Sequence, residues 1–144
     1  MLEAFGSRVY HLGPAGAGAR MKVLNQLLCG VHLAAAGEAI ALARRQGLPL
    51  DKTLEILCSG SAGSWMLADR GPRMASESFD NVTSAVDIFV KDMSLVLDAT
   101  REARFPAPIA HAAYLSFIEA AARGLGAKDD SAVTTNYHLE KRPR

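Results

Sequence analysis

The sequence predicts an all-α fold, a helical bundle around one long central helix. Apolar residues recur three and four positions apart along most of the chain after Gly18, which is typical of helices that bury one face. The only stretch with strand composition is "RVYHL" at residues 8–12. With 144 residues, of which 49% are hydrophobic and 22% charged, the chain is long enough for one domain with its own core.

The first helix is predicted at about 19–46, with Gly47 ending it. At about 1.5 Å per residue it would be a rod of roughly 40 Å, which makes it the central helix. Its apolar stripe is predicted at Leu24, Leu28, Val31 and Ala35. Gly30 and Gly37 weaken the helix, but their small size would let another backbone approach closely.

Glycine and proline mark the two short helices that follow. The first is predicted to begin at Pro49 or Asp51 and to end at Gly60. The second lies in "SWMLADRGPRM" and is predicted to stop at the Gly71-Pro72 pair. The next segment, "ASESFDNVTSA", is predicted to be a loop.

Two long helices complete the bundle. The first, at 84–103, places its apolar side chains on one face and its charges on the other. Prolines at 106 and 108 separate it from the second, which extends to about Leu125. A glycine cap and a short final helix are then predicted, with Asp130 or Ser131 as its N-cap.

The charge distribution excludes several classes of partner. Sixteen basic and fifteen acidic side chains give a formal charge of +1, with no basic stripe, so we expect no nucleic acid partner. The most apolar window, at 27–43, contains Glu38 and falls short of the roughly 20 apolar residues that a membrane span needs. The N-terminus does not resemble a secretory signal, so we expect a cytoplasmic protein without a membrane partner.

The glycines at 13, 16 and 18 precede a lysine, Lys22, and resemble a phosphate-binding loop only at first sight. Their order is the reverse of the dinucleotide-binding pattern, and Lys22 stands too far from the last glycine for a Walker loop. Asn25 and Gln26 lie one helical turn after Lys22 and flank it. The three form a polar patch near a helix start, although an ordinary solvated lysine face would give the same spacing.

The pattern G-x-x-G-x-G-x-x-x-K-x-x-N, which runs from Gly13 to Asn25, resembles the catalytic segment of the β-hydroxyacid dehydrogenases, the 3-hydroxyisobutyrate dehydrogenase family. Four later segments, "GSWMLADRGPRM", "SAVDIFVKDMSLVLDAT", "RFPAPIA" and "KDDSAV", resemble successive parts of that family's helical C-terminal domain. Within the family, "NQLLCGVHLAAAGEAIALA" is most similar to the L-threonate dehydrogenases. The resemblance implies an NAD(P)-dependent oxidation of a short hydroxyacid, L-threonate or a similar four-carbon sugar acid.

The same resemblance implies roles for individual residues. Lys22 would be the catalytic residue that exchanges the proton of the substrate hydroxyl. The family has a substrate-binding asparagine four residues after this lysine, where Gln26 stands here, so the role is open between Asn25 and Gln26. Lys91 and Asp92 match the family's cofactor-binding "KD" pair, with an i,i+4 ion pair between Lys91 and Asp87 as the alternative.

No metal site is predicted. His32 and His111 lie in helical segments and are not paired with carboxylates at metal-ligand spacing, so we expect satisfied helical histidines. Trp65 is predicted to be a core or domain-packing anchor.

The resemblance also divides the chain into segments. It implies that 1–13 are the end of a nucleotide-binding domain, 14–136 the helical C-terminal dehydrogenase domain and 137–144 a polar tail. We therefore expect a C-terminal piece of a dehydrogenase, either engineered or a natural truncation, inactive by itself and without tight NAD or NADP binding. A homodimer through the long helix is also expected. The alternative is a non-catalytic helical interaction or dimerisation module.

Overall fold

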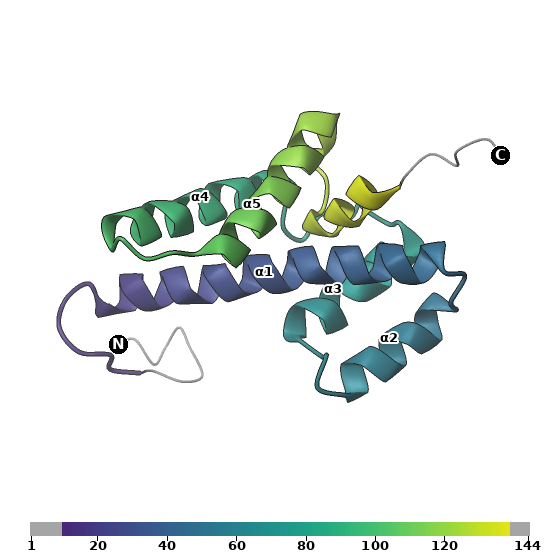
Figure 1. Ribbon diagram of the computed structural model, residues 1–144, viewed down its shortest axis with the longest axis horizontal. Helices are drawn as coiled ribbons and strands as arrows, with labels where there is room; N and C mark the ends of the chain where they lie inside the picture. Colours follow the sequence, from purple (N-terminus) through teal and green to yellow (C-terminus); the bar gives the residue numbers. More distant parts are fainter. Residues whose placement is uncertain (1–9, 139–144) are drawn as a thin grey trace.

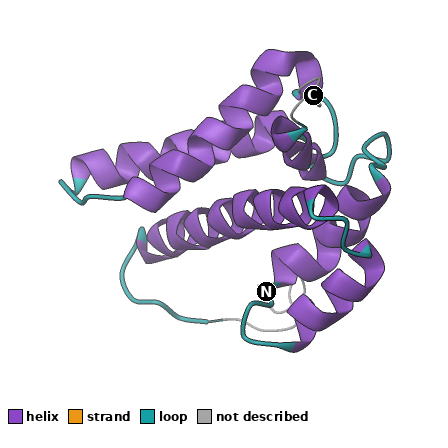
Figure 2. Ribbon diagram, turned by 45° about the vertical axis from the view of Figure 1, so that its right-hand side comes forward, coloured by secondary structure: helices purple, strands orange, loops and turns teal. Residues whose placement is uncertain are grey.

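The computed structural model describes residues 10–138, and every regular element in that range is helical (Figure 1). In chain order the elements are α1 (Ala17–Arg45), α2 (Leu50–Ser59), α3 (Trp65–Ser76), α4 (Val86–Glu102), α5 (Pro108–Ala120), the π-helical η2 (Ala121–Leu125) and the 3-10 helix η3 (Asp130–Tyr137). Figure 2 shows these helices joined by loops, without a strand in the described part of the chain. The predicted all-α fold is confirmed.

Helix α1 is the centre of the bundle. Helices α4, α5 and η3 lie along one side of it, and α2 and α3 lie along the other (Figure 1). Gly30 packs directly on the side chain of Met93 in α4. At Gly37, an added Cβ would lie only 3.0 Å from Cγ1 of Val133 in η3. The prediction that small residues let other helices approach α1 is therefore confirmed.

The apolar stripe predicted on α1 is not the side that the bundle buries. Leu24 and Leu28 are 56% and 53% exposed, whereas Leu33 and Ile40 are fully buried. The reason is that α2 and α3 flank only the second half of α1, so in the described chain one side of its first half faces outward (Figure 1).

By length and composition alone, α1 is apolar enough to cross a membrane. In its most apolar 18-residue window, however, 44% of the residues are buried inside the protein. Its contacts with α3, α4, α5 and η3 account for this burial. Helix α1 is the core helix of the bundle.

Helix α3 does not stop at the Gly71-Pro72 pair as predicted but continues to Ser76. Proline removes one backbone donor from the helix, yet the turn that follows is held by tertiary contacts. Met74 is fully buried, and Arg73 forms ion pairs with Asp69 and Asp129. These contacts offset the lost hydrogen bond, so the sequence signal for a break is overridden.

Helices α4 and α5 pack on each other as the apolar pattern of α4 predicts. The ring of Phe89 stacks on Phe117 of α5, with the ring centroids 5.0 Å apart. The last long helix was predicted to reach about Leu125, but α5 ends at Ala120 and η2 continues to Leu125, with Gly124 inside it at a φ of 83° and Gly126 as its C-cap. The N-cap of η3 is Asp129, which accepts a hydrogen bond from the backbone of Ser131. The prediction of Asp130 or Ser131 is one or two residues late, because the Asp130 side chain binds Arg70 instead.

Two predictions at the termini lie partly outside the described residues. Arg8 and Val9 of the predicted strand fall there, and residues 10–12 have no regular secondary structure. Residues 1–9 of the predicted first segment and 139–144 of the predicted tail also lie outside the described range.

Candidate functional site

Lys22 lies in the second turn of α1, and its side chain is exposed. The helix begins after Gly16, whose φ of 87° lies in the left-handed region that favours glycine. The backbone of Arg20 donates to the carbonyl of Gly16 and closes the first turn. The glycine cluster therefore turns the chain and starts the helix that carries Lys22.

A chain of side-chain contacts connects α1 to α4 beside Lys22. The Nδ2 of Asn25 donates to Oε1 of Gln26 at 2.9 Å, and Nε2 of Gln26 donates to Oδ2 of Asp92 in a short hydrogen bond. The Nζ of Lys91 lies 3.3 Å from the other carboxylate oxygen of Asp92. We call Asn25, Gln26, Asp92 and Lys91 the amide chain.

The amide chain contains four of the five predicted site residues, although they lie on two helices. Lys22 is one turn before Asn25 and Gln26 on α1, and residues at this spacing are neighbours on a helix surface. The side chain of Asp92 is only 16% exposed, whereas that of Lys91 is 68% exposed. Lys91 pairs with Asp92, and the alternative pair with Asp87 is not observed, because Asp87 lies against Gly126.

These groups suit proton transfer and the binding of a polar ligand. An exposed amine beside carboxamides can exchange a proton with a hydroxyl, while the amides donate to or accept from its neighbours. Among residues 10–138, no three His, Cys, Asp or Glu side chains are grouped so that they could hold a metal ion. Lys22 and the amide chain are therefore the candidate site for a polar ligand.

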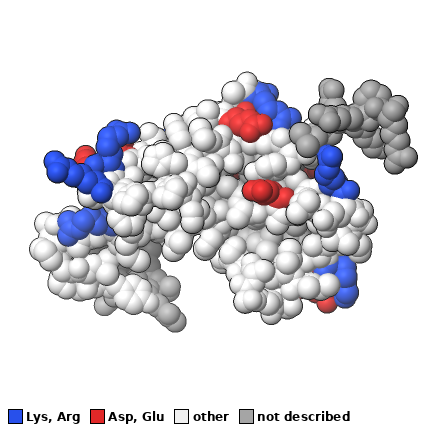
Figure 3. Space-filling view, in the orientation of Figure 1, with Lys and Arg blue, Asp and Glu red and all other residues white. Residues whose placement is uncertain are grey.

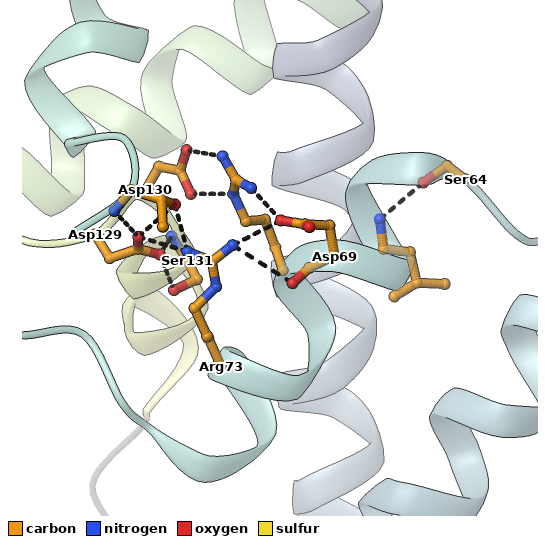
Figure 4. Close-up of polar contacts among 9 residues, drawn as sticks. Ser64, Asp69, Arg73, Asp129, Asp130 and Ser131 are labelled. Atoms are coloured by element: carbon orange, nitrogen blue, oxygen red, sulfur yellow. Dashed lines mark hydrogen bonds and ion pairs between the residues drawn. The ribbon is translucent and has the colours of Figure 1, made fainter. Parts of the chain in front are cut away.

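A second polar cluster joins α3 to η3 (Figure 4). Asp130 accepts two hydrogen bonds from Arg70, at 2.8 Å from Nε and at 3.2 Å from Nη2. Asp129 accepts from Arg73 at 2.8 Å, and Asp69 contacts both arginines. We call Asp69, Arg70, Arg73, Asp129 and Asp130 the ion network.

The surroundings of each aspartate in the ion network shift its pKa. Burial alone would raise the pKa of Asp129, but hydrogen bonds from Ser131 and from the backbone of Thr83, together with the charge of Arg73, lower it below its usual value. Burial raises the pKa of Asp130, and the hydrogen bond and charge of Arg70 oppose that rise. No sequence prediction included this network, although two arginines three positions apart in α3 and the Asp-Asp pair at the start of η3 were its signal.

The remaining candidates lie elsewhere. The Nδ1 of His111 lies 2.9 Å from the carbonyl oxygen of Ala107, which confirms a satisfied helical histidine. His32 borders a pocket of about 330 Å³ between α1 and the loop that joins α2 to α3. Trp65 is 68% exposed, so it is not a core anchor, while its predicted role as a domain-packing anchor stays a prediction. Its ring centroid lies 5.7 Å from the guanidinium carbon of Arg70. In Figure 3 the charged side chains form separate small groups on the face shown.

Comparison with known proteins gives a consistent result. Residues 16–137 match the family described as NAD-binding of NADP-dependent 3-hydroxyisobutyrate dehydrogenase. Over 134 residues the chain is 45% identical to the L-threonate dehydrogenase of Cupriavidus necator and 42% identical to that of Escherichia coli K12. These alignments cover 92% of the chain but only 45% and 44% of the two relatives. The chain therefore spans less than half the length of these curated relatives.

Solved structures show the same helical arrangement. A 3-hydroxyisobutyrate dehydrogenase from Salmonella typhimurium superposes with a TM-score of 0.89 at 43% identity, covering 94% of this chain and 47% of that one. The Mycobacterium tuberculosis 3-hydroxyisobutyrate dehydrogenase, solved with L-serine, gives a TM-score of 0.85 at 26% identity. That match covers 96% of this chain and 49% of the Mycobacterium protein.

Proposed function

The chain belongs to the 3-hydroxyisobutyrate dehydrogenase family, and from this we propose that it is the helical substrate-binding domain of an NAD(P)-dependent dehydrogenase that oxidises a short hydroxyacid. L-threonate or a similar four-carbon sugar acid is the proposed substrate, because relatives named L-threonate dehydrogenase are 42% to 45% identical over almost the whole chain. The observation that carries the proposal is the amide chain beside the exposed Lys22.

In this proposal Lys22 is the catalytic acid-base. The Nζ of Lys22 takes the proton from the substrate hydroxyl as the carbinol carbon becomes a carbonyl. NAD(P), when bound, would accept the hydride that the carbinol carbon loses. A positioned acid-base of this kind contributes about 10² to 10⁴-fold to a rate. An amide of the amide chain holds the substrate oxygen within reach of Lys22.

The described residues fit the cofactor only at one edge. Lys91 is a largely exposed cation on α4, and its positive charge would attract the anionic cofactor. Asp92 already accepts a hydrogen bond from Gln26 and pairs with Lys91, so its role would be to orient Lys91. We assign the cofactor contact to Lys91.

The decisive experiment is Lys22→Ala in the native protein that carries these residues. We expect the rate of L-threonate-dependent NAD(P) reduction to fall by about 10² to 10⁴-fold, because the acid-base is lost. Cofactor affinity, measured by fluorescence titration, should change little. Three- and four-carbon hydroxyacids assayed side by side would define the substrate class.

Lys52→Ala is the matched control, because Lys52 is an exposed lysine on α2 whose partner is Glu55. It should leave the rate unchanged. A Lys22→Ala variant with wild-type turnover would contradict the proposal and favour a non-catalytic interaction module. In that case the family fold would be retained for its surfaces alone.

The exposed apolar side of α1 supports the proposed homodimer. Met21, Leu24 and Leu28 are each about half exposed and lie on the first half of the helix. Exposed apolar patches of this kind mark association surfaces. Leu24→Glu should convert a dimer to a monomer in sedimentation velocity, whereas Ile56→Glu on α2 should not. A monomer at every concentration in the unmodified protein would contradict the dimer.

A further inference from the structure

We infer that Asp92 and Gln26 are positioning residues that orient the carboxamide of Asn25, and that Asn25 is the amide that meets the substrate beside Lys22. This inference rests on the proposed function and assigns the substrate contact within it. It follows from the direction of the hydrogen bonds in the amide chain.

The donor and acceptor order of the hydrogen bonds in the amide chain is set at Asp92. An ionised carboxylate only accepts hydrogen bonds, so the group of Gln26 that faces it must be the amide nitrogen. The oxygen of the same amide then faces Asn25 and accepts from its Nδ2 at 2.9 Å. Asp92 therefore fixes which end of the Gln26 carboxamide faces it. The contact between Gln26 and Asn25 alone would not fix this, because each carboxamide can both donate and accept.

The orientation of Gln26 in turn orients the carboxamide of Asn25. Its nitrogen donates to Gln26 and also lies 3.5 Å from the Sγ of Cys29, one turn further along α1. Among residues 10–138, the Oδ1 of Asn25 has no hydrogen-bond partner, and the residue is exposed. Asn25 thus presents a carbonyl oxygen, and Lys22 lies one turn away on the side opposite to Cys29.

An oxygen at this position suits the proposed chemistry. A carbonyl oxygen accepts a hydrogen bond from a substrate hydroxyl or from the ammonium form of Lys22, whereas a nitrogen turned the same way would repel the ammonium. Gln26 is engaged on both arms of its amide and is only partly exposed. The substrate contact therefore falls to Asn25.

The packing that supports the amide chain is close. Met93, the neighbour of Asp92, is fully buried and packs directly on Gly30 of α1. The close approach of the two backbones places Asp92 within hydrogen-bond reach of Gln26. Groups held by packed helices keep their geometry better than groups on loops, which is what a positioning residue requires.

A pair of substitutions in the native protein tests the inference. Gln26→Glu replaces the donor by an oxygen, so two carboxylates face each other and the hydrogen bond between positions 26 and 92 is lost. We expect kcat with L-threonate to fall by about tenfold or more, because misplaced contacts cost that much, while the KM for the nucleotide stays constant. Adding Asp92→Asn supplies an amide nitrogen that donates to the new carboxylate, whose second oxygen still accepts from Asn25. The double variant should recover most of the lost kcat.

Asp92→Asn alone keeps an oxygen that can accept from Gln26, so it should cost less than Gln26→Glu. The matched control is Gln46→Glu, the same chemical change in an exposed residue at the far end of α1, and it should leave kcat unchanged. Wild-type kcat in Gln26→Glu, or no recovery in the double variant, would overturn the inference. The second result would mean that Gln26 itself contacts the substrate.

A second measurement is independent of activity. In the 144-residue chain, Asp92→Ala should shift the side-chain amide NMR signals of both Gln26 and Asn25, although Asn25 does not touch Asp92. A shift confined to Gln26 would overturn the inference that Asp92 orients Asn25 through Gln26. If the native protein fails to oxidise L-threonate, the proposed function falls, and the NMR result still decides whether Asp92 orients Asn25.

Discussion

The amide chain and the ion network are both polar clusters between helices, but they differ in burial and in completeness. In the ion network, Asp130 is fully buried and binds Arg70 through both oxygens. Among residues 10–138, no buried side-chain nitrogen or oxygen lacks a hydrogen-bond partner. The amide chain is instead partly exposed and ends in the free oxygen of Asn25. A closed cluster that is buried at Asp129 and Asp130 stabilises the fold, whereas an open, exposed one can contact a ligand.

The strongest test of this contrast is Asp130→Ala. It leaves the Arg70 guanidinium buried without its main partner, and removing one member of a buried ion pair costs about 3 to 5 kcal/mol in free energy of unfolding. Urea denaturation measures the loss. Asp98→Ala, which removes an exposed partner of Arg101, should cost less than about 1 kcal/mol. Equal losses in the two variants would mean that the ion network stabilises the fold no more than an exposed ion pair does.

An intermediate effect is expected from Gly30→Ala. The added methyl group collides with Met93, and overpacking of this kind costs about 1 to 3 kcal/mol. Because the same contact supports Asp92, turnover should fall together with stability. Gly71→Ala, which collides with Leu54 on the other side of the bundle, should lower stability without lowering turnover of the folded protein. Turnover losses of the same size in both variants would show that the Gly30 contact does not support the site.

The smallest effect concerns pH. The folded-state pKa of Asp129 is lowered, so its contribution is complete above the unfolded value of about 3.9 and is lost as the pH falls through the folded value. Asp130, whose pKa is raised by burial against the pull of Arg70, contributes with the opposite sign. In Asp129→Asn, the free energy of unfolding, measured by urea titration, should therefore fall less between about pH 5 and about pH 3 than in the unmodified protein. An unchanged acid slope would contradict this role.

Much of the fold was predictable because helix ends are local. Glycines and prolines placed the first helix at 19–46, and the structure has it at Ala17–Arg45. The apolar pattern of α4 also gave its buried face, including Phe89 and Met93. Pro72 was misread, because a break signal is local whereas the contacts of Met74 and Arg73 that override it are not.

A motif named the candidate site residues, whose roles stay predictions, but it could not give the contacts between them. Gln26 and Asp92 are 66 positions apart, and only the packing of α4 on α1 brings them together. Periodicity reports which face of a helix is apolar, and it does not report which neighbour that face meets. The exposed Trp65 shows the same limit, since its size suggested burial that the described chain does not provide.

The length of α1 makes its far end matter for Lys22. Gly37, whose carbonyl accepts a hydrogen bond from Thr134 at 3.0 Å, lies roughly 22 Å from Lys22 along the helix axis at about 1.5 Å per residue. A tilt of only about 3° at that contact would move the amine by about 1 Å, a displacement that can cost about a hundredfold in rate. The packing of η3 at Gly37 and that of Met93 at Gly30 together fix the direction of α1, so a change at η3 bears on the position of Lys22 although it lies about four turns away.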